Sequence, residues 1–289
     1  MKILVLGAAG MLGSAVFRTL GAYSRFEAVG TLRSSVVRGF FSESEKRRLV
    51  AGIDVLSPGC LTGLFDDIRP DVVVNCVGLI KQLAASHDPL LVLPLNSLLP
   101  HRLANHCEKN GARLIHISTD CVFSGLKGQY LETDPSDAQD LYGKSKFIGE
   151  VNGRSHAITL RTSIIGHGLE SNDSLVDWFL AQRGSVTGFS RALFSGLPTT
   201  ELARVIAEYV IPHPELSGLF HVAAKPIDKY SLLQLVAAKY EKNIDIVPDD
   251  KFAIDRSLVS SLFESATGYN PRPWPELVSQ MWASQPARC

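Results

Sequence analysis

Residues 3–13 read Ile3-Leu4-Val5-Leu6-Gly7-Ala8-Ala9-Gly10-Met11-Leu12-Gly13, an apolar run that passes directly into a glycine-rich turn. The run predicts a buried strand, and the pattern from Met11 to Leu20 predicts an amphipathic helix. The first turn of such a helix presents unpaired N–H groups that attract phosphate. Gly7 permits the turn, Gly10 admits a pyrophosphate, and Gly13 lets the helix pack closely on the strand. We therefore predict a dinucleotide site; the alternative is an ordinary glycine-rich turn.

Short apolar runs alternate with helical patterns through the rest of the first half. We expect strands at Phe26–Thr31, Asp71–Cys76 and Arg113–Ile117, and helices at Leu98–Glu108 and Gly143–Val151. A run such as DVVVNC at 71–76 is continuously apolar, which is typical of a parallel strand buried on both faces. The sequence therefore predicts an α/β fold of the Rossmann type, a doubly wound parallel sheet with right-handed crossovers.

The regular alternation of strand and helix patterns becomes less clear after about residue 155. We expect a dinucleotide-binding domain over residues 1–155 and a smaller substrate-binding lobe over residues 156–289, with two late strands returning to the sheet. These strands are expected at Ala157–Arg161 and Gly218–Val222, and helices at Asp173–Gln182, Thr199–Tyr209 and Ser231–Tyr240. The proline-rich stretch Pro271–Pro275 is not expected to sustain regular structure.

The composition excludes several classes of protein. Of 289 residues, 45% are hydrophobic and 20% are charged, so the chain can bury a sizeable core. Lys+Arg and Asp+Glu are both 29, which argues against a broad basic face for nucleic acid. No apolar run approaches the ~18 residues of a membrane span, and we expect no leader before the first strand. The cysteines and histidines lack metal-site spacing. We expect a cytoplasmic protein without a structural metal.

The end of the second strand indicates which dinucleotide is bound. An NAD site usually places an acidic residue there to bind the ribose hydroxyls, but this region reads VGTLRSS at 29–35. Arg33 can instead neutralise a 2′-phosphate, which favours NADPH, with NADH as the alternative cofactor and a solvated loop cation as the alternative interpretation of Arg33. Further cofactor contacts are expected at two later strand ends: Asp54, Val55, Cys76, Val77 and Gly78.

A second pattern predicts chemistry. Hydride reduction of a ketone builds negative charge on the carbonyl oxygen, which must then receive a proton. Tyr142 can supply it, but a phenol of ordinary pKa ~10 ionises poorly at neutral pH. Lys146, one helical turn later in YGKSK, favours the phenolate and can reach the nicotinamide ribose. A hydroxyl from the HISTD segment would help to hold the substrate oxygen. We assign this role to Thr119, with Ser118 as the alternative.

The pair Tyr142 and Lys146 is a weak motif when taken alone, because YxxxK occurs often by chance. Without its surroundings we would favour a surface helix with the tyrosine packed on the sheet. The position of the pair raises its weight: it opens a helix, it follows a strand that ends in two hydroxyl residues, and both come after the glycine turn.

The chain resembles an extended short-chain dehydrogenase/reductase. Within that group it resembles the dTDP-4-dehydrorhamnose reductase family of nucleotide-sugar reductases. The resemblance covers nearly the whole chain. Within the cofactor fold it is carried by GAAGMLG at 7–13, STDCVFSG at 118–125, GQYLETD at 128–134 and YGKSKFIGE at 142–150. Beyond the cofactor fold it is carried by LRTS at 160–163, SGLPTTELA at 195–203, GLFHVAA at 218–224 and RPWPEL at 272–277.

The resemblance implies NADPH-dependent reduction of a keto group, typically C4, on a nucleoside-diphosphate 6-deoxyhexose. It makes Thr119, Tyr142 and Lys146 catalytic. The residues that it places on the cofactor turn are Gly7, Gly10, Met11, Leu12 and Gly13. The residues that it places at the substrate are Ser118, Asp120, Cys121, Gly196, Pro198 and Thr199, with Arg161 and Trp178 as candidates for the diphosphate or the base. A buried strand-end salt bridge is the alternative for Arg161, and a helix-core aromatic for Trp178.

The sequence departs from the family pattern on the substrate side. Cys121 stands where the family usually has an aromatic residue, and Ile164-Ile165-Gly166-His167-Gly168 replaces the usual WVYG continuation. These changes concern the sugar, the base and the reacting carbon, and they leave the cofactor chemistry intact. Two other functions stay open: an epimerase or dehydratase that retains its NAD, and a non-catalytic NADP-binding regulatory subunit. A homodimer is an assembly that the sequence allows.

Overall fold

Seven strands form the central sheet in the order β10-β6-β5-β4-β1-β2-β3, and every neighbouring pair is parallel. The structure is a computed structural model of the chain, and it describes residues 1–36, 39–81, 87–169 and 174–285. The strands of this sheet are β1 (Lys2–Leu6), β2 (Glu27–Thr31), β3 (Leu49–Val50), β4 (Val72–Asn75), β5 (Arg113–Thr119), β6 (Ala157–Thr162) and β10 (Gly218–His221).

The strand order reverses at β1, which pairs with β2 on one side and with β4 on the other. In a doubly wound sheet such a reversal leaves a crevice at the carboxyl ends of the strands, where ligands bind. The predicted Rossmann-type fold is confirmed. β6 and β10 both follow residue 155 and complete the sheet beside β5, so the main sheet draws on the second half of the chain.

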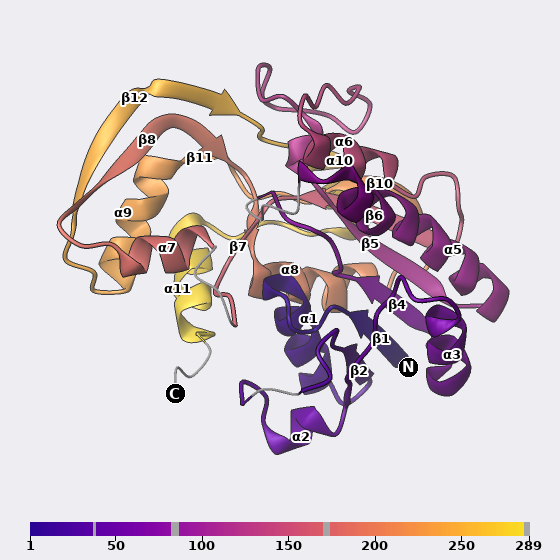
Figure 1. Cartoon of the computed structure of the whole chain (residues 1–289). Helices are drawn as coiled ribbons and strands as arrows, with labels where there is room; N and C mark the ends of the chain where they lie inside the picture. Colours follow the sequence, from indigo (N-terminus) through magenta and orange to yellow (C-terminus); the bar gives the residue numbers. More distant parts are fainter. Residues whose placement is uncertain (37–38, 82–86, 170–173, 286–289) are drawn as a thin grey trace.

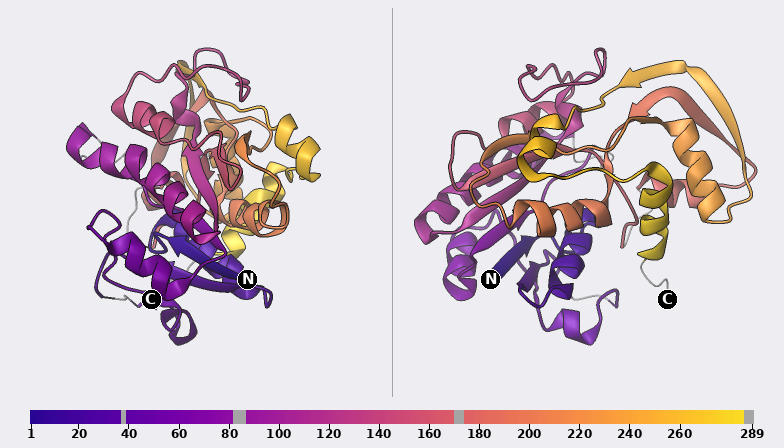
Figure 2. Two further views of the ribbon diagram at one scale, coloured as in Figure 1. Left: turned by 90° about the vertical axis from the view of Figure 1, so that its right-hand side faces the viewer. Right: turned by 180° about the vertical axis from the view of Figure 1, so that it is seen from behind.

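Helices cover both faces of the sheet (Figure 1 and Figure 2). Successive side chains of β1 alternate between two cores: Ile3 and Val5 join one cluster, whereas Leu4 and Leu6 join the other. The first cluster includes α1 (Met11–Ala22) and α8 (Thr199–Val205), and the second includes α3 (Cys60–Ile68) and α5 (Leu99–Asn110). Because both faces of the central sheet are buried, consecutive residues along its strands are apolar.

The structure contains further helices and short helical turns. They are α2 (Glu43–Lys46), α4 (Pro89–Val92), the π-helical turn η2 (Leu93–Leu98), the 3₁₀ turn η3 (Asp120–Val122), α6 (Leu141–Ile148), α7 (Leu175–Ala181), the π-helical turn η4 (Ile206–Val210), α9 (Lys229–Lys239), α10 (Ser261–Thr267) and α11 (Trp274–Ala283). Asp173, the expected start of α7, lies outside the described residues.

A second, three-stranded sheet forms the smaller lobe, in the order β11-β8-β12. Its strands are β8 (Ser185–Phe194), β11 (Ile227–Asp228) and β12 (Asp245–Asp255), and a two-stranded pair β7 (Ile164–Ile165) and β9 (Leu197–Pro198) lies between the lobes. β8 and β12 arch away from the central sheet together with α7 and α9, and the end of β12 returns toward α6 (Figure 1).

The expectation for Pro271–Pro275 was wrong in its last two residues. α11 begins at Trp274, with Pro275 in its first turn and Pro273 at the N-cap. Proline is tolerated there because the first-turn N–H groups have no intrahelical acceptor in any case. The Trp274 indole nitrogen donates to the Lys225 carbonyl at 2.7 Å, which fixes the start of the helix against the body.

Within residues 1–36, 39–81, 87–169 and 174–285, no helix is both long enough and apolar enough to cross a membrane.

Candidate active site

The glycine turn fits a pyrophosphate. Gly7 has a φ of +80°, and a Cβ at Gly13 would come within 2.1 Å of the Gly7 carbonyl oxygen, so a side chain at Gly13 would push α1 off the turn. Gly10 caps α1 without a side-chain hydrogen bond. The N–H groups of Met11 and Leu12 therefore remain available to an anion at the amino end of α1.

The end of β4 lies directly beside this turn. The Cys76 N–H donates to the Leu6 carbonyl at 3.2 Å, and Val77 Cγ2 lies 3.1 Å from the position that a Cβ on Gly7 would take. The predicted cofactor residues Cys76 and Val77 thus meet the glycine turn, although 63 or more positions separate them from it in sequence, whereas a Cβ at Gly78 would lie 3.1 Å from Asn96 Oδ1.

The residues expected at the adenosine end occupy the two loops that follow β2 and β3. Arg33 is exposed, and it forms no hydrogen bond or ion pair with the described part of the chain. Asp54 is exposed, and its carboxylate accepts from the Leu56 N–H at 3.1 Å, while Val55 is buried. This arrangement leaves the Arg33 guanidinium available to a phosphate and equally to solvent.

The helix that carries Tyr142 presses against the end of β5. Asp140 caps α6 by accepting from the Gly143 N–H at 2.7 Å. A Cβ at Gly143 would come within 2.2 Å of the Cys121 carbonyl oxygen, so only glycine allows this approach. Tyr142 is thereby held beside Thr119.

Thr119 is fixed at the point where β5 ends. Its hydroxyl donates to Asp120 Oδ1 at 3.2 Å and accepts from the Cys121 N–H at 3.1 Å. Burial raises the pKa of the Tyr142 phenol, and the neighbouring Cys121 and Asp120 raise it further, whereas a hydrogen bond with Thr119 lowers it. The phenol therefore keeps its proton at neutral pH, as a proton donor must.

Lys146 is buried beneath the same helix. Its ammonium donates to the Ile117 carbonyl of β5 at 2.7 Å. Burial lowers the pKa of Lys146 from 10.5 to about 8, while Glu150 and Cys76 act in the opposite direction. A charge that titrates near neutral pH is a common property of catalytic groups.

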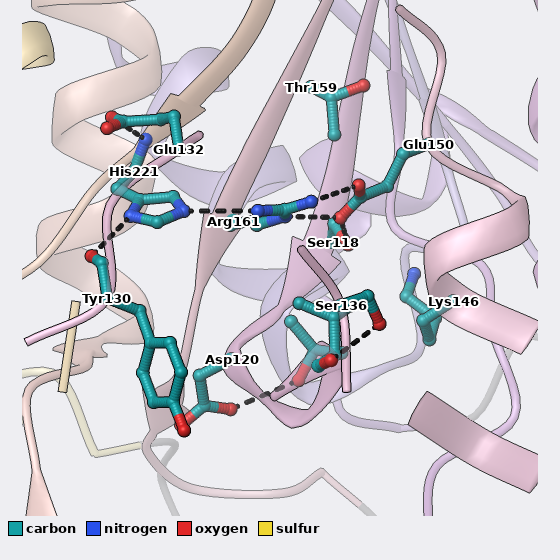
Figure 3. A network of polar contacts seen from close by, with 12 residues as sticks. Ser118, Asp120, Tyr130, Glu132, Ser136, Lys146, Glu150, Thr159, Arg161 and His221 are labelled. Carbon is teal, nitrogen blue, oxygen red and sulfur yellow. Dashed lines mark hydrogen bonds and ion pairs between the residues drawn. The ribbon is translucent and has the colours of Figure 1, made fainter. Parts of the chain in front are cut away.

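A buried carboxylate joins three elements of the site. Glu150, which follows α6, accepts from the Ser118 hydroxyl of β5 at 2.7 Å. It also accepts from Arg161 of β6, from Nε at 2.6 Å and from Nη2 at 2.7 Å. Figure 3 shows Arg161 between Glu150 and His221, with Lys146 on the Glu150 side. We call these contacts of Glu150 with Ser118 and Arg161 the brace. The brace sets the position of β5 relative to the helix that carries Tyr142 and Lys146.

The geometry favours the salt-bridge interpretation of Arg161 over the diphosphate interpretation. The Arg161 side chain is 2% exposed, and Nη1 lies 3.4 Å from His221 Nε2. The guanidinium also stacks over Phe123, at 5.2 Å from the ring centroid. Burial and the neighbouring Arg161 charge lower the pKa of His221 to about 4, so this imidazole is neutral. All three Arg161 nitrogens are engaged within the protein.

Comparison with known proteins decides the family. The model of the RmlD substrate binding domain matches residues 1–285. The chain belongs to the RmlD family. It is thus an extended short-chain dehydrogenase/reductase, as its motifs predicted, in a family of oxidoreductases.

Relatives within the RmlD family have more than one role. The chain is 24% identical over 293 residues to methionine adenosyltransferase 2 subunit beta of Xenopus tropicalis, covering 94% of this chain and 78% of that protein. It is 32% identical over 152 residues to dTDP-4-dehydrorhamnose reductase of Burkholderia thailandensis, covering 52% and 45%. The structure of dTDP-4-dehydrorhamnose reductase of Bacillus anthracis with NADP superposes with a TM-score of 0.77, at 18% identity and 98% coverage of both chains.

The other substrate candidates fall into two groups. Gly196, Pro198 and Thr199 lie at the joint between the lobes, where a Cβ at Gly196 would come within 2.2 Å of the Ser163 carbonyl oxygen. Asp120 and Cys121 line the chemical end, and burial raises the pKa of both side chains. Trp178, on α7, is 41% exposed and is therefore not a helix-core aromatic. Its contact with a nucleotide base remains a prediction.

Sequence reasoning missed three residues of the site: Glu150, Lys229 and Arg256. Glu150 lies four residues after Lys146 in YGKSKFIGE, a spacing that could have indicated it. Lys229 and Arg256 carry no local signal, because only the second sheet brings them to Asp120 and Cys121. Among the described residues, no group of three or more His, Cys, Asp or Glu side chains could hold a metal ion.

The brace can be tested through stability. Glu150→Gln leaves the Arg161 charge buried and uncompensated, which costs about 3–5 kcal/mol of the free energy of unfolding. Glu108→Gln is the matched control, because Glu108 forms an exposed pair with Arg154 at 2.7 Å that contributes less than about 1 kcal/mol. Urea denaturation measures both. Equal losses in the two variants would show that the brace has no special role.

Proposed function

We propose that this protein is a cytoplasmic, NADPH-dependent reductase of a nucleoside-diphosphate 6-deoxyhexose, and that it reduces a keto group at C4 for deoxysugar and surface polysaccharide synthesis. The observation that carries the proposal is the position of Tyr142 on α6, which packs against the end of β5 where Thr119 stands, at the sheet edge that also holds the glycine turn. The family match along residues 1–285 supports it, as does the reductase relative.

The cofactor would be held by residues from three strand ends. The N–H groups that follow Gly10 would receive the pyrophosphate, Arg33 would meet the 2′-phosphate, and Cys76–Gly78 would border the chain of the cofactor. When bound, NADPH supplies the hydride. The structural relative from Bacillus anthracis was solved with NADP, which agrees with this fit.

Tyr142 would act as the proton donor. The group that receives hydride becomes an alkoxide, and a neutral phenol within hydrogen-bond reach can protonate it. Thr119 would orient the same oxygen, because its hydroxyl lies between Asp120 and the Cys121 N–H at the end of β5. Burial keeps the phenol protonated until it reacts.

Lys146 would stabilise the phenolate that forms on Tyr142. It lies one turn later on α6, and its ammonium is already anchored to β5 through the Ile117 carbonyl. The Glu150 carboxylate supports the charged form of Lys146 against the effect of burial. The lysine would therefore supply positive charge one helical turn from Tyr142 without being exposed to water.

A regulatory subunit is a second candidate function. The match to methionine adenosyltransferase 2 subunit beta covers 94% of this chain. A regulatory protein would co-purify with a stoichiometric partner, and its Tyr142→Phe variant would be unimpaired. The paired Thr119 and Tyr142 favour catalysis, because binding NADPH alone does not require a proton donor.

The reductase should lose activity when its proton donor is removed. NADPH oxidation at 340 nm is followed with a panel of 4-keto-6-deoxy nucleotide sugars. We expect Tyr142→Phe to lower kcat by ~10²-fold or more. Tyr23→Phe is the control, because the Tyr23 hydroxyl bonds Glu208 at 2.6 Å, outside the proposed active site. No oxidation by the wild-type protein with any sugar would refute the proposal.

The pH profile should report Lys146. Its ammonium is lost as the pH rises through about 8, so kcat for reduction should fall above that pH. Tyr142 keeps its proton in that range, because its pKa is raised. Lys146→Arg retains the charge at high pH, so this variant, although slower, should lack the decline near pH 8. A decline at the same pH in the arginine variant would assign the titration to another group.

Arg33 should determine the choice of cofactor. Arg33→Ala removes the charge that would meet the 2′-phosphate, so we expect the KM for NADPH to rise about tenfold or more, with the KM for NADH almost unchanged. Arg183→Ala, which removes an exposed arginine of the second lobe, serves as the control. Equal effects of Arg33→Ala on both cofactors would contradict the assignment.

A further inference from the structure

A short loop connects the central sheet to the smaller lobe. Residues 166–168, which we call the joint loop, follow β7, and β7 pairs with β9 between the lobes. A Cβ at Gly166 would come within 2.5 Å of Thr199 Oγ1, so the loop lies directly against Thr199, one of the predicted substrate residues. The joint loop therefore borders the region that is predicted to bind the substrate.

His167 ties the joint loop to two helices of the smaller lobe. Its Nδ1 lies 2.7 Å from Asp177 Oδ1 on α7, and its Nε2 lies 2.8 Å from the hydroxyl of Tyr240, the C-cap residue of α9. We call these two hydrogen bonds the latch. Because His167 is buried and both ring nitrogens are engaged, the latch fixes the imidazole in one orientation.

The Asp177 carboxylate sets the direction of the latch. Burial opposes its charged form, but hydrogen bonds from His167, from the Gly168 N–H at 2.7 Å and from the Ser174 hydroxyl at 2.9 Å lower its pKa. An ionised carboxylate only accepts hydrogen bonds, so His167 Nδ1 is the donor. The Tyr240 hydroxyl can then donate to Nε2, and the latch forms one chain from α9 through the joint loop to α7.

A cavity separates part of the joint loop from α1. Its volume is about 290 Å³, and its lining includes Gly166 and His167 from the loop and Met11 and Ala15 from α1. Atoms that line a cavity lack packing partners on that side. The position of the loop therefore depends on the latch more than on packing against α1.

The helices α7 and α9 form one unit within the smaller lobe. They lie side by side, next to the arched strands β8 and β12 (Figure 1). The Lys242 ammonium, shortly after α9, donates to the carbonyls of Leu180 and Gln182 at the end of α7, at 2.7 Å and 2.6 Å. This link does not involve His167. The latch therefore connects the whole unit, including the exposed Trp178 of α7, to the joint loop.

We propose that His167 is a positioning residue for the nucleotide sugar: through the latch it holds α7 and α9 at the distance from the joint loop that the bound substrate requires. The inference rests on the nucleotide-sugar binding of the proposed function. The glycine turn and Arg33 lie on loops of the central sheet, so cofactor binding does not depend on the latch. His167 belongs to residues 164–168, which depart from the family pattern, so the latch is a property of this chain's own sequence.

Binding of nucleotide sugars that carry no keto group tests the inference without turnover. Isothermal titration with UDP-glucose and dTDP-glucose is run on the protein saturated with NADP⁺. We expect His167→Leu, which removes both hydrogen bonds of the latch, to weaken whichever sugar nucleotide the wild-type protein binds by about tenfold or more. The affinity for NADP⁺ should stay unchanged. His167→Asn retains a donor for Asp177 and should recover part of the loss.

Three further variants serve as partner and controls. Tyr240→Phe should also weaken the sugar nucleotide, because it removes only the hydroxyl that completes the latch. Tyr230→Phe is the matched control on the same helix, since the Tyr230 hydroxyl accepts from Gln234 Nε2 at 2.9 Å within α9. Lys242→Met removes the link inside the unit and should lower the melting temperature while leaving the affinity for the sugar nucleotide nearly unchanged.

The outcomes separate the inference from the proposed function. Lower sugar-nucleotide affinity in His167→Leu and Tyr240→Phe, with NADP⁺ affinity retained, supports the inference even if the wild-type protein reduces no keto sugar. Wild-type affinity in both variants would overturn it and leave the proposed function standing. If His167→Leu does not fold, the comparison of Tyr240→Phe with Tyr230→Phe decides.

A general loss of stability would give a different pattern. Equal losses of sugar-nucleotide affinity in His167→Leu and Lys242→Met, or a parallel loss of NADP⁺ binding, would overturn the inference, because instability alone would then account for the effect. A wild-type protein that neither binds nor reduces any nucleotide sugar would contradict both the inference and the proposed function.

Discussion

The buried ion pair between Glu150 and Arg161 holds the active site together. The Glu150 carboxylate accepts hydrogen bonds from the Ser118 hydroxyl of β5 and from two of the three Arg161 nitrogens on β6. Glu150 itself lies two residues after the helix that carries Tyr142 and Lys146. Two strands and a helix are therefore fixed to one point. Removing either partner would leave a buried charge, so the arrangement is all-or-none. The same carboxylate also keeps Lys146 more readily protonated.

The site is built from two lobes with different tasks. The central sheet supplies the glycine turn, the end of β4 and Thr119 at the carboxyl ends of parallel strands, where a doubly wound fold places its ligands, and α6 beside them carries Tyr142 and Lys146. The smaller sheet supplies positive charge through Lys229 and Arg256. The residues around the glycine turn can therefore stay the same while changes in the second lobe alter which substrate is accepted. Of the departures from the family pattern, Cys121 follows β5 of the central sheet but lies 4.0 Å from Arg256 of the second lobe, and residues 164–168 follow β6.

The sequence predicted what depends on local patterns. Apolar runs such as Val72–Asn75 are buried on both faces, and the spacing of Gly7 and Gly13 encodes a contact within one turn of chain. β12 could not be found in this way. It is mostly exposed, carries Pro248 and a run of charged residues, and becomes a strand only because it pairs with β8. The position of Arg256 beside Cys121 could not be predicted either, because it depends on the pairing of β12 with β8.

The central claim is that the Tyr142 hydroxyl faces the reactive carbon of the nicotinamide when NADPH occupies the glycine turn. A crystal structure of the NADPH complex measures this separation directly. The account predicts roughly 5 Å, because a substrate carbonyl must lie about 3–3.5 Å from both groups. A hydroxyl more than roughly 12 Å from the ring, or facing away from it, would contradict the account, since two contacts of that length cannot span such a gap.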